Sequence, residues 1–352
     1  MAIQPITGTD LQKELQHKID SKTKPLGALG RLEEVALQVG LIQGSVNPQI
    51  RHPHIVVFAG DHGIAATGLV NPYPQAVTAQ MVLNFIAGGA AINVFCRQQE
   101  IGLTVVDAGV NFDFPADLPS KRFIRSKIGY GTRNYLEGAA MRRDEVQQAM
   151  AAGEKIVEDL FREGCNCIGL GEMGIGNTSA ASLIMSFITR IPVEECAGRG
   201  TGVSDEQLEK KIATLRDVFQ LHLPAIVASP GPLTILQQVG GFEIAMMTGA
   251  YLKAAELKMI ILVDGFITTA ALLLAQLFNK EVQSHCIFSH NSGEQGHEKM
   301  LQYLGARPLL NLGMRLGEGT GAAMAFPLVQ SAVGFLREMA SFESAGVSKS
   351  GE

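Results

Sequence analysis

The chain has 352 residues, of which 46% are hydrophobic and 18% are charged, so it can bury the core of one large domain or two modest ones. Its 29 basic and 34 acidic residues give a net charge of −5 without a basic block, which argues against nucleic acid or an anionic membrane as a partner. The first 20 residues are polar and lack the apolar segment of a signal peptide. The spacing of the five cysteines does not match that of metal ligands. We expect them to be reduced, as in a cytoplasmic protein.

Both ends of the chain carry helical patterns. Residues 8–42 hold two such patterns, which are joined by Ser21–Gly27, and residues 322–340 hold another. No strand is expected within these segments. We therefore predict a small helical subdomain built from residues 1–50 and 322–352, beside an α/β nucleotide-binding catalytic domain of residues 51–321.

Between these ends, short apolar runs rich in β-branched residues alternate with longer helical patterns. The predicted strands are His54–Ala59, Leu103–Asp107, Asn166–Leu170, Met259–Asp264 and, more weakly, Ser284–Ser289 and Pro308–Leu312. The predicted helices include Val77–Phe95, Arg143–Arg162, Ser179–Thr189, Asp205–Leu221, Phe242–Leu257 and Phe266–Phe278. Continuous apolar strands are typical of a parallel sheet that is covered on both faces. The pattern predicts an α/β fold with a doubly wound, mainly parallel sheet of about six strands and helices on both faces.

The most apolar stretch of the sequence runs from Met259 to Phe278. It is interrupted by Asp264, Gly265 and two threonines. A membrane-spanning helix needs about 20 predominantly apolar residues, so we do not expect this stretch to cross a membrane.

One glutamate near the C-terminal end is flanked by glycines. Glu318 stands between Gly317 and Gly319, shortly before the apolar run Ala322–Phe326. Glycine permits a close approach of the backbone to a ligand and a positive φ. The glutamate can therefore present a base or a hydrogen-bond acceptor to a small molecule, or it can lie in a capping turn and face water. A second glycine-rich segment that contains a glutamate, Gly169–Thr178, favours the functional interpretation.

Polar residues follow five of the predicted strands. They include Asp61 and His62, Asp107, Glu172 and Asn177, Asp264, and Ser289 with His290 and Glu294. Ligands of open parallel sheets bind outside the carboxyl ends of the strands, so these residues are candidates for one site. Each of Asp61, His62 and Asp264 can also simply hold a tight turn. No ligand pair stands on one helix face, and we do not predict a metal site.

Two glycine-rich loops are candidates for phosphate binding. Gly174–Ser179 lies between a strand and a helix, where backbone amides attract an anion. Gly198–Gly202 contains an arginine and precedes another helix. Neither matches the dinucleotide or the ATP-binding glycine pattern, so a mononucleotide or sugar phosphate fits better. Lys210 and Lys211 in the next helix can face this site or the solvent.

Six motifs taken together, in order and spacing, resemble the nicotinate-nucleotide–dimethylbenzimidazole phosphoribosyltransferase family. They are Lys24–Glu33, Gly60–Gly63, Gly171–Thr178, Asp264–Phe266, Ser289–Ser292 and Arg315–Gly321, and the resemblance covers about residues 10–340. It implies transfer of phosphoribose from nicotinate mononucleotide to 5,6-dimethylbenzimidazole, which gives α-ribazole 5′-phosphate and nicotinate for the nucleotide loop of cobalamin. It also implies a cytoplasmic homodimer that acts on small molecules without a metal or other cofactor.

The resemblance also implies roles for single residues. Glu318 corresponds to the catalytic base, and Glu172 and Lys211 correspond to charged residues on the nucleotide side. The acceptor base is expected near Asn71–Met81, where this chain has Tyr73 and Met81 in place of the Ser and Gln of some family members. The predicted substrate-binding residues are Glu172, Gly174, Gly176, Asn177, Thr178, Gly200, Gly202, Lys211, Asp264, Ser289, Tyr73, Gln80, Met81 and Leu316. Two alternatives stay open: another phosphoribosyl or nucleoside transfer on the same scaffold, and a non-catalytic mononucleotide-binding module.

Overall fold

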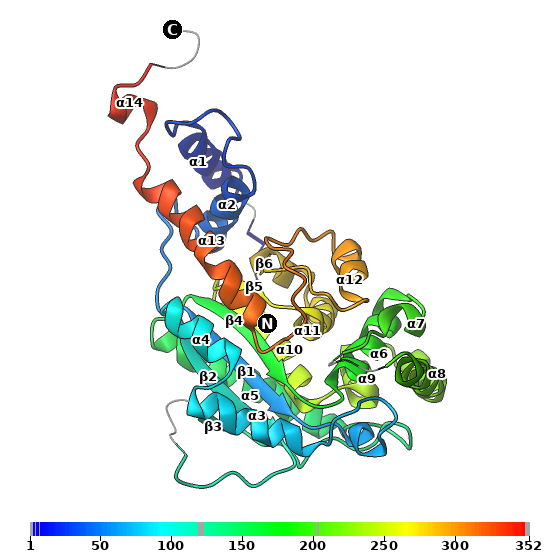
Figure 1. Cartoon of the computed structure of the whole chain (residues 1–352). Coiled ribbons are helices and arrows are strands. Elements are labelled where there is room, and N and C mark those ends of the chain that lie inside the picture. The colour runs from blue at the N-terminus through cyan, green and yellow to red at the C-terminus, as the bar shows by residue number, and fades with distance from the viewer. Residues whose placement is uncertain are drawn as a thin grey trace.

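A single parallel sheet lies at the centre of the molecule (Figure 1), a computed structural model that describes residues 3, 5–6, 8–118, 123–200, 202 and 204–348. Its strands are β1 (His54–Gly60), β2 (Gly102–Gly109), β3 (Phe123–Arg125), β4 (Cys167–Met173), β5 (Ile260–Val263) and β6 (Cys286–Phe288). The spatial order is β3-β2-β1-β4-β5-β6. The direction of winding reverses between β1 and β4, and open α/β sheets bind ligands at such a point.

Helices cover both faces of this sheet, because the strand residues alternate between two apolar cores. Val56 and Phe58 of β1 belong to the core formed with α5 (Arg143–Arg162), α6 (Asn177–Thr189), α10 (Phe242–Glu256) and α11 (Phe266–Phe278). Ile55 and Val57 belong to the other core, with α2 (Arg31–Gln43), α3 (Ala76–Ala87), α4 (Ala91–Gln98) and α13 (Thr320–Glu338). The predicted doubly wound α/β fold is confirmed.

The remaining helical elements surround this framework. They are α1 (Thr9–Asp20), α7 (Val193–Cys196), α8 (Asp205–Ala228), α9 (Pro232–Val239), α12 (His297–Tyr303), α14 (Phe342–Ala345) and the 3-10 helices η1 (Gly63–Thr67) and η2 (Lys280–His285). Helix α1 packs on α2, and α13 runs from the sheet to α2 (Figure 1). Helix α13 also contacts β4 and β5. Its N-terminal turns therefore lie close to the strands that carry Glu172 and Asp264 at their ends. The division into the domains 1–50, 51–321 and 322–352 stays a prediction.

The prediction of one long helix over Val77–Phe95 is wrong. Helix α3 ends at Ala87, Gly88 takes a left-handed conformation with φ 84°, and α4 begins at Ala91. Glycine at this position ends helices because it adopts positive φ without strain. By length and composition the stretch 76–98 could cross a membrane, but this break divides it into two short helices.

The prediction of a strand over Pro308–Leu312 is also wrong. The segment makes an isolated bridge between His290 and Leu310, and the Leu312 side chain is 57% exposed. Proline has no N–H to donate, which limits strand pairing at the start of the segment. The sheet gains its sixth strand from β3 instead, which pairs with β2 and which the sequence did not reveal because it is three residues long.

Candidate functional site

A pocket opens beyond the carboxyl ends of β4 and β5. Of the predicted site residues it is lined by Glu172, Gly174, Asn177, Thr178, Gly200, Asp264 and Leu316. Further lining residues include His290, Ser292, Glu294 and Arg315, which follow β6 or precede Glu318. Four of the six motif segments therefore meet around one cavity at the carboxyl edge of the sheet, whereas Lys24–Glu33 and Gly60–Gly63 do not line it.

The turn from β4 into α6 forms one wall of the pocket. Gly176 caps α6 in a left-handed conformation with φ 97°, and the Asn177 side chain donates a hydrogen bond to Glu172 Oε2. Glu172 is buried, and burial together with the nearby carboxylates of Asp264 and Glu243 raises its pKa to about 8. This wall thus combines an anion-attracting helix N-terminus with a carboxyl group that holds a proton near neutral pH.

The lysine that faces the two glycine-rich loops is Lys211. Its Nζ donates to Thr178 Oγ1 at 3.1 Å and to the carbonyl oxygen of Gly198 at 3.0 Å. Burial lowers the pKa of Lys211 to about 8, against the opposing effect of the Glu294 carboxylate. Lys210 is exposed. Lys211 therefore ties α8 to both loops from behind the pocket, and it does not itself line the cavity.

The second glycine-rich loop enters the pocket through Gly200. Its N–H donates to Glu294 Oε2 at 3.2 Å, and its carbonyl accepts from Arg315 Nη1 at 2.8 Å. Arg315 brings a positive charge to the pocket wall, a contribution that its place in the Arg315–Gly321 motif could have revealed. Gly202 is exposed and does not line the cavity, and Thr201 lies outside the described residues.

Glu318 lies in the loop that leads from Arg315 into α13. It is 4% exposed, and its Oε2 has no hydrogen-bond partner within the part of the chain that the structure describes. Burial raises the pKa of Glu318 to about 7, although a hydrogen bond from the Ile92 amide opposes this rise. The carboxylate therefore lies at the start of α4, beside the pocket, and does not itself line the cavity.

Two glycines allow this loop to approach β4. A Cβ on Gly171 would lie 2.4 Å from the carbonyl carbon of Glu318. A Cβ on Gly317 would lie 2.3 Å from Glu172 Oε1. Because Gly171 has no side chain, the backbone of Glu318 can lie against β4. Because Gly317 has none, the Glu172 carboxyl group can lie against the loop.

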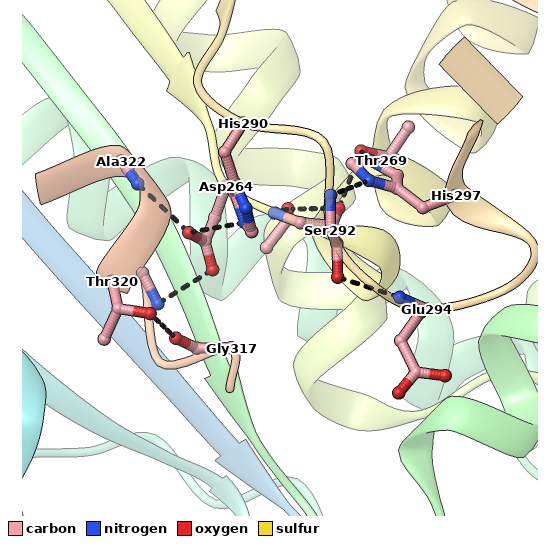
Figure 2. A network of polar contacts seen from close by, with 12 residues as sticks. Asp264, Thr269, His290, Ser292, Glu294, His297, Gly317, Thr320 and Ala322 are labelled. Carbon is pink, nitrogen blue, oxygen red and sulfur yellow. Dashed lines mark hydrogen bonds and ion pairs between the residues drawn. The ribbon is translucent and has the colours of Figure 1, made fainter. Parts of the chain in front are cut away.

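Asp264 follows β5 and reaches the same loop (Figure 2). Its Oδ2 accepts from the Gly319 amide at 3.1 Å, and its Oδ1 accepts from the Ala322 amide at 3.0 Å. Burial raises its pKa to about 7. His290 Nε2 is 3.9 Å from Asp264 Oδ1, which is too far for a hydrogen bond.

The other predicted residues do not line the cavity. Ser289 is fully buried, whereas Tyr73 and Gln80 are exposed. Met81, a residue of α3, is partly buried against the apolar core on that face of the sheet. None of the four lines the pocket. The acceptor-base site near Asn71–Met81 therefore stays a prediction.

Asp61 and His62, at the end of β1, have structural partners. The Asn111 amide donates to Asp61 Oδ2 at 2.8 Å, and His62 Nε2 lies 2.6 Å from Glu243 Oε1 with both side chains fully buried. These contacts match the interpretation that they hold the turn after the strand. The pocket thus has a helix N-terminus that attracts anions, the buried Glu172 carboxyl group in its wall, and the buried Glu318 carboxylate beside it.

Comparison with known proteins agrees with this arrangement. A family model described as a phosphoribosyltransferase matches residues 4–347. The nicotinate-nucleotide–dimethylbenzimidazole phosphoribosyltransferase of Photobacterium profundum is 54% identical over 97% of this chain and 98% of its own length. The enzyme of the same name from Dechloromonas aromatica is 52% identical, with 97% of each chain covered. The structure of CobT from Thermus thermophilus has 40% identity and a TM-score of 0.91, and the match covers 97% of this chain and 99% of that one.

Proposed function

The chain belongs to the nicotinate-nucleotide–dimethylbenzimidazole phosphoribosyltransferase family, and from this premise we propose the reaction and the roles of its residues. The enzyme transfers phosphoribose from nicotinate mononucleotide to 5,6-dimethylbenzimidazole. The products are α-ribazole 5′-phosphate and nicotinate, and the reaction serves assembly of the nucleotide loop of cobalamin. The observation that supports the chemistry is the buried Glu318 carboxylate, which has an unpartnered oxygen beside a pocket for the nucleotide.

The donor needs no general acid. The ring nitrogen of nicotinate mononucleotide is a pyridinium, so it leaves C1′ as a neutral pyridine nitrogen that takes the electron pair of the broken bond. The acceptor attacks from the opposite side of C1′. This direct displacement converts a β-linked donor into an α-linked product.

The acceptor does need a base. As the lone pair of one benzimidazole nitrogen forms the new bond to C1′, positive charge develops on the ring and the other N–H becomes acidic. Glu318 takes this proton, an effect typically worth about 10²–10⁴-fold in rate. Burial raises its pKa to about 7, which suits proton acceptance near neutral pH better than the usual carboxylate value does.

The nucleotide lies at the N-terminus of α6. Its phosphate is attracted by the backbone amides of the Gly174–Thr178 turn and by the positive charge of Arg315. Lys211 supports this site from behind through Thr178. Glu172, which lines the same wall, faces the ribose and the departing ring.

We also propose that the enzyme is a homodimer and works in the cytoplasm. Val94 in α4 and Tyr73 are each 46% exposed, and apolar surface of this kind is often covered by a second copy. Sedimentation velocity at micromolar concentration should then give about twice the chain mass of 37.6 kDa. A monomer at that concentration would contradict the proposal.

A product assay tests the reaction itself. The enzyme is incubated with nicotinate mononucleotide, with and without 5,6-dimethylbenzimidazole, and the products are followed by mass spectrometry. We expect nicotinate and α-ribazole 5′-phosphate to appear in equal amounts, and only when the base is present. Release of nicotinate that depends on inorganic phosphate would indicate phosphorolysis, and binding of the nucleotide without any product would contradict the proposed transfer.

A further inference from the structure

The backbone that carries Glu318 is held in an unusual conformation. Gly317, Glu318 and Gly319 all have positive φ, at 83°, 64° and 82°. Glycine tolerates this left-handed region, but a residue with a Cβ adopts it only where its surroundings hold it there. The position of the Glu318 carboxylate therefore depends on contacts made by the residues around it.

Asp264 supplies those contacts from β5. One of its carboxylate oxygens accepts the Gly319 amide, directly after Glu318, and the other accepts the Ala322 amide in the first turn of α13. The first amides of a helix have no carbonyl partner within it, so a carboxylate satisfies them well. On the other side of the turn, Thr320 Oγ1 donates to the Gly317 carbonyl at 2.7 Å (Figure 2).

Both oxygens of Asp264 are engaged by the loop. It lines the pocket but is only 1% exposed, and each oxygen accepts one amide of the loop that carries Glu318. Glu318 differs, because its Oε2 is unpartnered among the described residues. The two residues therefore have different roles, although both are buried carboxylates of one site.

The pairing of β5 with β4 also relates the position of Asp264 to that of Glu172 on the opposite wall of the pocket. Val263, the residue before Asp264, pairs with Leu170 of β4, two residues before Glu172. The sheet therefore fixes Asp264 relative to Glu172, and Asp264 fixes the loop of Glu318 relative to the sheet. The spacing between Glu172 and Glu318 follows from this chain of contacts.

We propose that Asp264 is a positioning residue that sets the Glu318 carboxylate for proton transfer, and that it does not bind the substrate. The inference rests on the proposed role of Glu318. It replaces our sequence-based expectation that Asp264 is a substrate ligand.

Asp264→Asn tests this inference. Asparagine keeps the size of the side chain, but its NH₂ group meets one of the two loop amides, donor against donor. We expect kcat to fall roughly 10- to 100-fold, the scale on which a misplaced catalytic group acts. The dissociation constant of nicotinate mononucleotide, measured by calorimetry, should stay within about threefold of wild type. A large loss of nucleotide affinity with kcat unchanged would instead make Asp264 a ligand and overturn the proposal.

A double-mutant cycle separates positioning from a general structural effect. If Asp264 acts through Glu318, Asp264→Asn should change kcat little when Glu318→Gln is already present. Additive losses would overturn the inference. If the Glu318→Gln variant turns over near the wild-type rate, the proposed role of Glu318 as general base is wrong. If Glu318→Gln is slow but Asp264→Asn is fully active, only the positioning role of Asp264 is wrong.

Two further variants keep the test decisive. Glu145→Gln alters another buried carboxylate, which accepts from the Arg142 amide at the start of α5, and it should leave kcat near wild type. Thr320→Val removes the hydroxyl contact with Gly317 at little change in volume, and it tests the same loop if Asp264→Asn does not fold. We expect it to lower kcat a few-fold, and this loss should also disappear in the Glu318→Gln background. A Thr320→Val effect that persists there would contradict positioning by the loop.

Discussion

Replacing Glu318 by glutamine should lower kcat by roughly 10²-fold or more, while the affinity for nicotinate mononucleotide changes little. Glutamine keeps the shape of the side chain and one acceptor oxygen, but it cannot take a proton. The carboxylate acts on the acceptor base in the transition state, so its loss should appear in kcat. Single-turnover kinetics together with calorimetry would measure the two quantities separately.

The pH dependence should identify the same group. Burial raises the pKa of Glu318 to about 7, so the basic, ionised form predominates above this pH and is lost below it. The kcat of the wild-type enzyme should therefore rise with pH through about 7 and level off above it. The residual activity of Glu318→Gln should lack this rise.

Glu172→Gln is the matched control for this experiment. It also removes a buried carboxyl group of the site, but Glu172 lines the nucleotide wall beside Asn177. We expect it to affect nucleotide affinity more than turnover. Turnover of Glu318→Gln within a few-fold of wild type would overturn the assignment of the base and leave Glu172 as the next candidate.

Gly176→Val should weaken binding of nicotinate mononucleotide at least about tenfold, because it distorts the turn that presents the α6 amides. Gly176 has φ 97°, and a Cβ there would lie 3.2 Å from Ala65 Cβ and 3.3 Å from His62 Cβ. A β-branched residue cannot adopt this conformation without strain. Calorimetry would measure the affinity, and thermal unfolding should stay cooperative.

Gly334→Val provides the control for that substitution. Gly334 lies within α13, has no positive φ, and would place its Cβ in open space. Nucleotide affinity in this variant should match wild type. Unchanged affinity in Gly176→Val would remove the Gly174–Ser179 loop from the site.

Local patterns in the sequence determined the architecture. The strands around Val57, Val105 and Ile168 read as continuous apolar runs because both faces of the sheet are covered, and this pattern predicted a doubly wound α/β fold. The glycines beside Glu172 and Glu318 marked segments where the backbone makes close approaches. Such features are visible in the sequence because they depend on neighbouring residues.

Contacts between distant segments decided the rest. The choice of Lys211 over Lys210 depends on which side of α8 meets Thr178, and the sequence of one helix does not contain that information. The strand β3 exists because three residues pair with β2. Asp264 and Ala322 are far apart in the chain, so only the packed sheet and α13 revealed that Asp264 holds the loop of Glu318. Sequence patterns report local preference and burial, whereas such partnerships arise when tertiary packing brings remote donors and acceptors together.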